Sequence, residues 1–239
     1  MKNWYDKESY CCDDLIRIVE FLRSPEGCPW DREQDHHTIR NNFLEEAYEA
    51  VEGIDRDDSV MLREELGDVL LQIALHSQME AEKGTFDFND VCTGICRKMI
   101  ARHPHVFGEE CADNVTDAAK SWEQQKRREK GLYGLVDQLQ QVSTALPALM
   151  RAQKLISRAS AAGCCTDPED ETLRGMLEDA LFENKGEAED WGRLLFLLCE
   201  RMNRNGISAE EALSRESDRM IQCFLEMQHG DKPTEGESL

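Results

Sequence analysis

Along most of the chain, apolar residues recur every three or four positions, which is the spacing of a helix with one buried face. In the first such segment, residues 12–23, the apolar stripe consists of Leu15, Ile18, Val19 and Leu22. The same spacing predicts helices over residues 38–56, 59–83, 89–102 and 116–130. The alternation of apolar and polar residues that is typical of half-buried strands is not found. We therefore predict an all-α fold.

The helical pattern begins again near Leu146 and predicts a second set of helices over residues 147–162, 168–184, 187–205 and 208–227. Three segments of the first half have counterparts in the same order in the second. They are residues 44–47 with 177–180, residues 64–70 with 189–195, and residues 97–100 with 218–221. The sequence thus indicates a duplication into two tandem helical bundles. We expect domains at 12–130 and 146–228, a linker at 131–145 and a disordered tail at 229–239.

The net charge of the chain limits the classes of molecule that it is expected to bind. Forty-nine acidic residues against 28 Lys and Arg give a formal net charge of −21, which argues against binding nucleic acid. No apolar run is long enough to cross a membrane and no secretion signal is recognisable, so we expect a cytoplasmic protein.

The ten cysteines form no CxxC pair and are interpreted as reduced thiols, several of them buried.

Acidic residues cluster on two of the predicted helices. Glu46 and Glu49 lie one turn apart on the second helix, and Glu65 and Asp68 lie one turn apart on the third. Antiparallel packing of these helices would make four carboxylates converge, an arrangement that a divalent cation stabilises. The alternative is that these residues form an ordinary solvated acidic face. A di-iron centre would need a histidine three positions after one of these carboxylates, and none follows them there.

Several motifs together resemble the MazG family of all-α nucleoside triphosphate pyrophosphohydrolases. The resemblance covers nearly all of residues 12–228. The segments that carry it are Gly27–Asp31 with Gln34, Leu44–Glu49, Glu64–Asp68, Arg102–Gly108, Trp122 with Lys126, and Leu146–Lys154. It implies hydrolysis of nucleoside triphosphates to monophosphate and pyrophosphate, with Mg²⁺ as cofactor and Mn²⁺ as a substitute.

The resemblance also implies roles for individual residues. Glu46, Glu49, Glu65 and Asp68 would hold the metal, and Glu45 would orient or deprotonate the attacking water, so Glu45, Glu46 and Glu49 are the expected catalytic residues. The expected substrate-binding residues are Lys98, Arg102 and Lys126 at the phosphates and Trp30 and Trp122 at the base. If the resemblance is set aside, the three basic residues could equally be ordinary surface residues, and Trp122 could equally be a core residue. His103 and His105 are assigned to structure.

The second half departs from the family pattern at its metal motif. Phe182 stands where Glu49 stands in the first half, and Arg193 replaces Asp68, although Asp179 and Asp190 keep two acidic positions. We therefore expect a structural or dimerising second domain and a homodimer whose active site lies in residues 12–130. The competing hypothesis is a nucleotide sensor or protein-interaction module without catalysis. A sensor would not need all the carboxylates together with Lys98 and Arg102.

Overall fold

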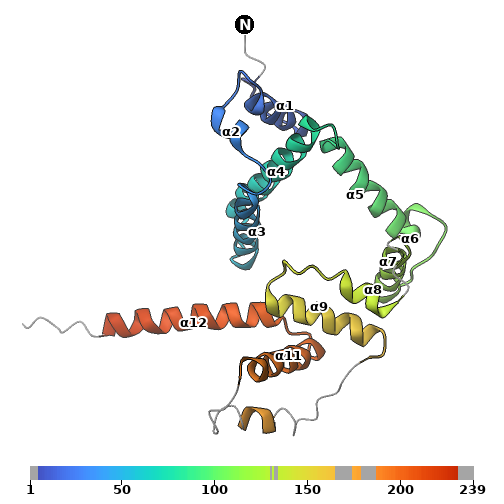
Figure 1. The fold of residues 1–239 in the computed structure, drawn as a ribbon, viewed down its shortest axis with the longest axis vertical. Helices are drawn as coiled ribbons and strands as arrows, with labels where there is room; N and C mark the ends of the chain where they lie inside the picture. The colour runs from blue at the N-terminus through green and yellow to red at the C-terminus, as the bar shows by residue number, and fades with distance from the viewer. Residues whose placement is uncertain (1–4, 130, 132–133, 165–173, 179–186, 231–239) are drawn as a thin grey trace, which may run out of the picture. The chain divides into compact units, whose positions relative to one another are not determined.

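The computed structural model describes residues 5–129, 131, 134–164, 174–178 and 187–230. Every regular element within these ranges is a helix, which confirms the all-α prediction (Figure 1). The helices are α1 Cys12–Arg23, α2 Pro29–Glu33, α3 Arg40–Asp55, α4 Ser59–Glu82, α5 Phe88–Arg102, α6 Pro104–Phe107, α7 Val115–Glu129, α8 Leu135–Gln140, α9 Ala148–Ala161, α11 Ala188–Arg204 and α12 Ala209–Gly230. None of the described helices has the length and apolarity needed to cross a membrane.

Two compact units divide the chain, Met1–Glu123 and Gln124–Leu239. In the first unit, helix α4 is central and packs against α1, α3 and α5. The core of this unit joins α1, the segment before α3, and the second half of α4. Its buried residues are Val19, Ile39, Ala74, Leu75 and Met79, with Leu15, Leu71 and Phe88 packed against them. Removal of these side chains from water holds α1, α4 and the start of α5 together with the segment before α3.

The turn between α3 and α4 makes these helices an antiparallel hairpin. Asp57 adopts the left-handed backbone conformation with φ 51°, which aspartate tolerates better than most residues. Asp58 then caps α4, because its side chain accepts hydrogen bonds from the backbone N–H groups of Val60 at 3.0 Å and Met61 at 3.1 Å. Gly53 lets the helices approach closely, since a Cβ there would lie 2.9 Å from the backbone nitrogen of Leu62.

The segment between α1 and α2 folds tightly back on the end of α1. The backbone N–H of Cys28 donates to the carbonyl of Leu22 at 2.8 Å. A Cβ on Gly27 would lie 2.1 Å from the carbonyl oxygen of Phe21, so no other residue fits without rearrangement. The Arg23 guanidinium donates to the carbonyl oxygens of Asp31 and Gln34, on either side of the end of α2. This segment is therefore built to a fixed shape.

The second unit repeats part of the packing scheme of the first. Helix α11 packs against α9 and α12, as α4 packs against α1 and α5. Its core consists of Ile156, Cys199 and Ala209, with Leu149, Ala152 and Met202 against them. In the register set by the matched segments, Cys199 takes the place of Ala74 and Ala209 that of Phe88. These two pairs of residues therefore occupy equivalent positions in that register.

The helices differ from the sequence prediction mainly where they are short. Helices α2, α6 and α8 were not predicted, and α8 lies inside the segment expected to be a linker, where it packs on α9. Helix α7 begins at Val115, within one residue of the prediction, and the Asn114 side chain accepts the N–H of Asp117 at 3.0 Å. Helix α12 continues to Gly230, beyond the expected boundary at 228. Of the predicted helix 168–184, residues 174–178 are helical and the rest lies outside the described residues.

The cysteines correct another expectation. The nine described cysteines are free thiols, as expected, but only Cys199 is buried among them. Cys28 and Cys223 are half-buried and the other six are exposed. The core of each unit consists of a few residues, and Cys199 is the one described cysteine among them.

Candidate metal centre

The α3–α4 hairpin brings three of the four predicted metal ligands together. Glu46 and Glu49 lie one turn apart on α3, and Glu65 faces them from α4. One carboxylate oxygen from each of the three lies within 4.8 Å of the others. The cluster is half-buried, so it borders the packed interface of the two helices. Oxygen ligands from three carboxylates suit a hard divalent cation.

The electrostatics of the cluster show the cost of holding these charges together. Burial raises the pKa of Glu46, and the nearby charges of Asp68 and Glu49 raise it further. Burial also raises the pKa of Glu65, followed by the charges of Glu49 and Asp68. Asp68 therefore acts on the cluster, although its oxygens lie outside the group of three. A cation bound among these oxygens would relieve the repulsion, so the residues present fit a metal ion.

Glu45 occupies the solvent side of the cluster. Its side chain is exposed, next in sequence to Glu46, and its charge contributes to the raised pKa of Glu46.

The predicted substrate residues Arg102 and Trp122 contact each other. The Arg102 guanidinium carbon lies 5.3 Å from the centre of the Trp122 ring, a cation–π contact, and the Arg102 side chain is buried. The ring of His103 meets Trp122 edge-on with centres 4.8 Å apart. The Nδ1 atom of His103 lies 2.7 Å from the carbonyl of Met99, which ties down the end of α5. This cluster assembles where α5, α6 and α7 meet.

The remaining predicted substrate residues are carried by other helices than the carboxylates. Trp30 is 63% exposed on α2, which packs on α1. Lys98 is exposed near the end of α5. Helix α5 meets the core through Phe88 and runs apart from α4 beyond it (Figure 1). At 1.5 Å per residue, Lys98 stands about 15 Å from that contact. Lys126 belongs to the other compact unit.

The described second-unit residues that match the metal motif have other structural surroundings than their counterparts in the first unit. Asp190, which matches Glu65, lies in the first turn of α11, where its carboxylate accepts the backbone N–H of Glu187 at 3.1 Å. It thus caps a helix. Arg193, which matches Asp68, is exposed. Asp179 and Phe182 lie outside the described residues.

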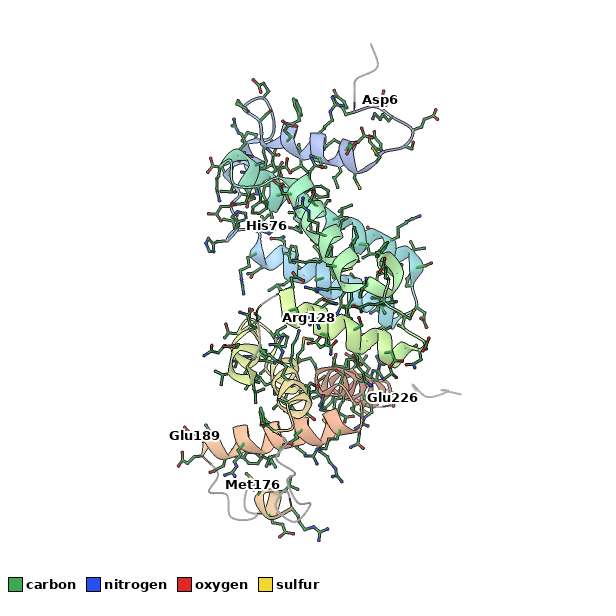
Figure 2. All side chains as sticks on the ribbon, turned by 90° about the vertical axis from the view of Figure 1, so that its right-hand side faces the viewer. Asp6, His76, Arg128, Met176, Glu189 and Glu226 are labelled. Atoms are coloured by element: carbon green, nitrogen blue, oxygen red, sulfur yellow. The ribbon has the colours of Figure 1, made fainter. Side chains whose placement is uncertain are left out.

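Sequence reasoning missed a cluster of titratable side chains at the other end of α4. His36 contacts both His76 and Glu80 there, and His76 is labelled in Figure 2. The one sequence signal was the spacing of His76 and Glu80, four residues apart on a predicted helix. Nothing in the sequence placed His36, which precedes α3, next to them.

Comparison with known proteins agrees with these motifs. The MazG nucleotide pyrophosphohydrolase domain matches residues 34–107, which include all four predicted metal ligands. The nucleoside triphosphate pyrophosphohydrolase of Escherichia coli (strain K12) is 38% identical over 232 residues, covering 90% of this chain and 86% of the relative. The nucleoside triphosphate pyrophosphohydrolase/pyrophosphatase MazG of Thermotoga maritima is 37% identical over 224 residues, covering 90% and 85%. The uncharacterized protein YabN of Bacillus subtilis is 44% identical over 138 residues, covering 58% of this chain and 28% of that protein.

Proposed function

Because the chain belongs to the MazG family, we propose that its α3–α4 hairpin is the catalytic centre of a nucleoside triphosphate pyrophosphohydrolase. The observation that carries the proposal is the convergence of Glu46, Glu49 and Glu65 to within 4.8 Å. The reaction cuts a nucleoside triphosphate into the monophosphate and pyrophosphate. Residues 12–130 carry the chemistry in this proposal.

The chain's own residues divide the work of this hydrolysis. Glu46, Glu49, Glu65 and Asp68 would hold Mg²⁺, or Mn²⁺ in its place, as hard cations with oxygen ligands. A cation held there would supply positive charge against the phosphates. Glu45 takes a proton from a water molecule as the water oxygen bonds to the α-phosphorus. The bond from the α-phosphorus to the bridging oxygen breaks, and that oxygen leaves with pyrophosphate.

Substrate binding falls to the basic and aromatic residues. Lys98, Arg102 and Lys126 supply positive charge for the phosphates, and Trp30 and Trp122 supply flat apolar surfaces for the base. Arg102 must exchange its contact with Trp122 for a phosphate, or hold Trp122 in place for the base. We propose that non-standard nucleotides are the physiological substrates, as in a house-cleaning role. Turnover of only the standard triphosphates by the purified protein would contradict this.

A homodimer fits the distribution of apolar surface. Leu44, Tyr48 and Val51 form an exposed stripe on α3 beside the carboxylates, and the tyrosine is 57% exposed. A second copy of the chain would cover it. The same association would give Lys98, at the far end of α5, a site to serve in the partner. The second unit contributes structure and dimer contacts in this proposal, and light scattering that gives a monomer mass would contradict it.

The deciding experiment measures pyrophosphate release from a panel of nucleoside triphosphates, with Mg²⁺ and with a chelator. Glu49→Gln should abolish release, whereas Asp190→Asn, which retains a helix-capping side chain, should leave it intact. If the wild-type protein cleaves no triphosphate, catalysis is refuted, and nucleotide binding becomes the measurement for the sensor alternative.

A mixed dimer tests the sharing of sites between copies. Glu49→Gln and Lys98→Ala chains, each inactive alone, are co-expressed. If Lys98 serves the partner, one site of the mixed dimer has both intact residues and activity returns. If each chain serves itself, every site of the mixed dimer lacks one residue and stays inactive.

A further inference from the structure

Two histidines from distant parts of the sequence face each other through the same ring atom. The Nδ1 atoms of His36 and His76 lie 2.7 Å apart, and the two ring planes differ by only 9°. His36 belongs to the segment that leads into α3, and His76 belongs to α4 (labelled in Figure 2). A separation of 2.7 Å between two ring nitrogens is a hydrogen bond, so one nitrogen carries a proton and the other a lone pair.

The other nitrogen of His36 is held by a carboxylate. Its Nε2 atom lies 2.6 Å from Oε1 of Glu80, one turn after His76 on α4. Glu80 also accepts from Lys83 Nζ at 2.7 Å and from the hydroxyl of Thr85. The Lys83 bond first, and then those of Thr85 and His36, lower the pKa of Glu80 to about 2. Glu80 is thus an anion at every pH of interest, and Nε2 of His36 carries the hydrogen.

Proton counting limits what this arrangement can hold. With both rings neutral, His76 Nδ1–H donates to His36. With one added proton, His36 is an imidazolium and donates from Nδ1 to a neutral His76. A second proton leaves two N–H groups pointing at each other, so the hydrogen bond is lost and two positive rings face at 2.7 Å. The pair therefore tolerates one positive charge and not two.

The surroundings oppose the second charge on the His76 side. Burial lowers the pKa of His76, and the charge of His36 lowers it further. The charged and titratable groups around the pair are Asp35 and His37 on the segment of His36, and Glu80 and Lys83 on α4. From α3, the apolar ring of Phe43 meets His76 edge-on with centres 5.8 Å apart.

The pair lies where it can control the start of the carboxylate-bearing helix. The Asp35 side chain accepts the backbone N–H groups of His37 at 2.8 Å and Thr38 at 2.9 Å, which makes a compact turn. Ile39, directly after it, is buried in the core, and α3 with Glu46 and Glu49 follows. Loss of the histidine contact would therefore free the turn, Ile39 and the first turn of α3 together.

We propose that His36 and His76 form a proton-operated latch that fastens the segment leading into α3 onto α4. The latch is closed while the pair holds no more than one added proton. The latch opens when the second proton binds, so acidification loosens the start of α3 while Glu80 is still ionised. This inference concerns local opening of the fold and holds whether or not the chain hydrolyses nucleotides.

The test combines two measurements on the intact protein between pH 7.5 and 5. Histidine ring nitrogen NMR on protein with ¹⁵N-labelled histidine should show that the ring of His76 stays neutral below the ordinary pKa of histidine, because its pKa is lowered. Amide hydrogen exchange, corrected for its intrinsic pH dependence, should show protection at Phe43 falling by up to about tenfold per pH unit once the second proton binds. His37→Gln is the matched control and should behave as wild type.

His76→Phe gives the complementary test, because phenylalanine fills the space beside Phe43 and accepts no proton. In this variant the protection at Phe43 should be lower than in wild type at pH 7.5 and should lose its pH dependence. A His76 ring that becomes charged at the ordinary pKa of histidine, or protection at Phe43 that is the same at pH 7.5 and 5 in wild type, would overturn the proposal.

Discussion

Arg23 and Glu82 form a two-pronged ion pair between α1 and α4, with Nε to Oε1 at 2.7 Å and Nη2 to Oε2 at 2.8 Å. The Arg23 side chain is 6% exposed, and its remaining donor serves the carbonyl groups of Asp31 and Gln34. One guanidinium thus connects the ends of two helices to the segment that presents Trp30. Its planar fork makes these bonds simultaneously, which an ammonium group cannot do.

Replacing Arg23 with lysine should therefore destabilise the protein although the charge is kept. Lysine cannot keep both hydrogen bonds to Glu82 and those to the part-buried carbonyl groups of Asp31 and Gln34, with an expected cost of about 1–3 kcal/mol in the free energy of unfolding. Urea unfolding measures it. Arg32→Lys is the control, since Arg32 is exposed and contacts only the carbonyl of Pro25 among the hydrogen bonds described. An equal decrease in the free energy of unfolding in both variants would show that the paired hydrogen bonds of Arg23 do not stabilise the fold more than those of an exposed arginine.

Glu65→Gln should have opposite effects on the metal-free and the metal-bound protein. Because the pKa of Glu65 is raised, its ionised form destabilises the metal-free fold at neutral pH, and a neutral glutamine relieves this. The melting temperature in a chelator should rise. Affinity for Mg²⁺ should fall at least about tenfold. Removing a metal ligand should weaken binding at least as much as removing a residue that only orients a ligand.

Glu64→Gln is the matched control for this pair of effects. It removes one neighbouring charge from an exposed side chain outside the cluster. Calorimetric titration with Mg²⁺ should give nearly the wild-type affinity. If Glu64→Gln weakens binding as much as Glu65→Gln, general charge attracts the ion and the α3–α4 cluster is not a defined site.

The acid stability of the protein should depend on Glu80. Its pKa of about 2 lies below the ordinary value of 4.5, so its ionised form stabilises the folded state. That contribution is fully present above pH 4.5 and is lost as the pH falls towards about 2. The difference in unfolding free energy between wild type and Glu80→Gln should therefore shrink over this range. A constant difference from pH 6 to pH 2 would contradict the assignment.

The thiols should react with an electrophilic probe at very different rates. Cys199 is 2% exposed, and burial raises its pKa, so both access and thiolate population are low. Cys92 is exposed on α5. Timed alkylation followed by peptide mass spectrometry should show Cys92 modified well before Cys199. Simultaneous labelling would indicate that the core of the second unit opens readily.

The long helices could be predicted from the sequence because each has its own apolar stripe and recognisable ends. Helix α1 was placed at the correct residues, and α4 ends within one residue of the prediction. The short helices could not be predicted, since five residues such as Pro29–Glu33 hold little more than one turn, too few for an apolar stripe to repeat. Helix α2 exists because Gly27 and Arg23 fold it onto α1, which are contacts that no local pattern encodes.

The candidate site shows the same division. The convergence of Glu46, Glu49 and Glu65 followed from one-turn spacing on two helices joined by a short turn. The pairing of Arg102 with Trp122 depends instead on how α7 returns to α5 across an irregular segment, which spacing does not reveal. The contact between His36 and His76 spans 40 residues and depends on the turn at Asp35, so it too was invisible in the sequence.

The close approach at Gly27 sets a limit on variation in this protein. A side chain of any kind would begin with a carbon 2.1 Å from the Phe21 carbonyl oxygen and 2.4 Å from that of Leu22, both backbone atoms at the end of α1. A saturation library at residue 27 should therefore return glycine alone among well-folded clones, with alanine excluded along with larger residues. Tolerance to substitution at this position therefore depends on a single atom, because the space beside the Cα holds a hydrogen but not a carbon.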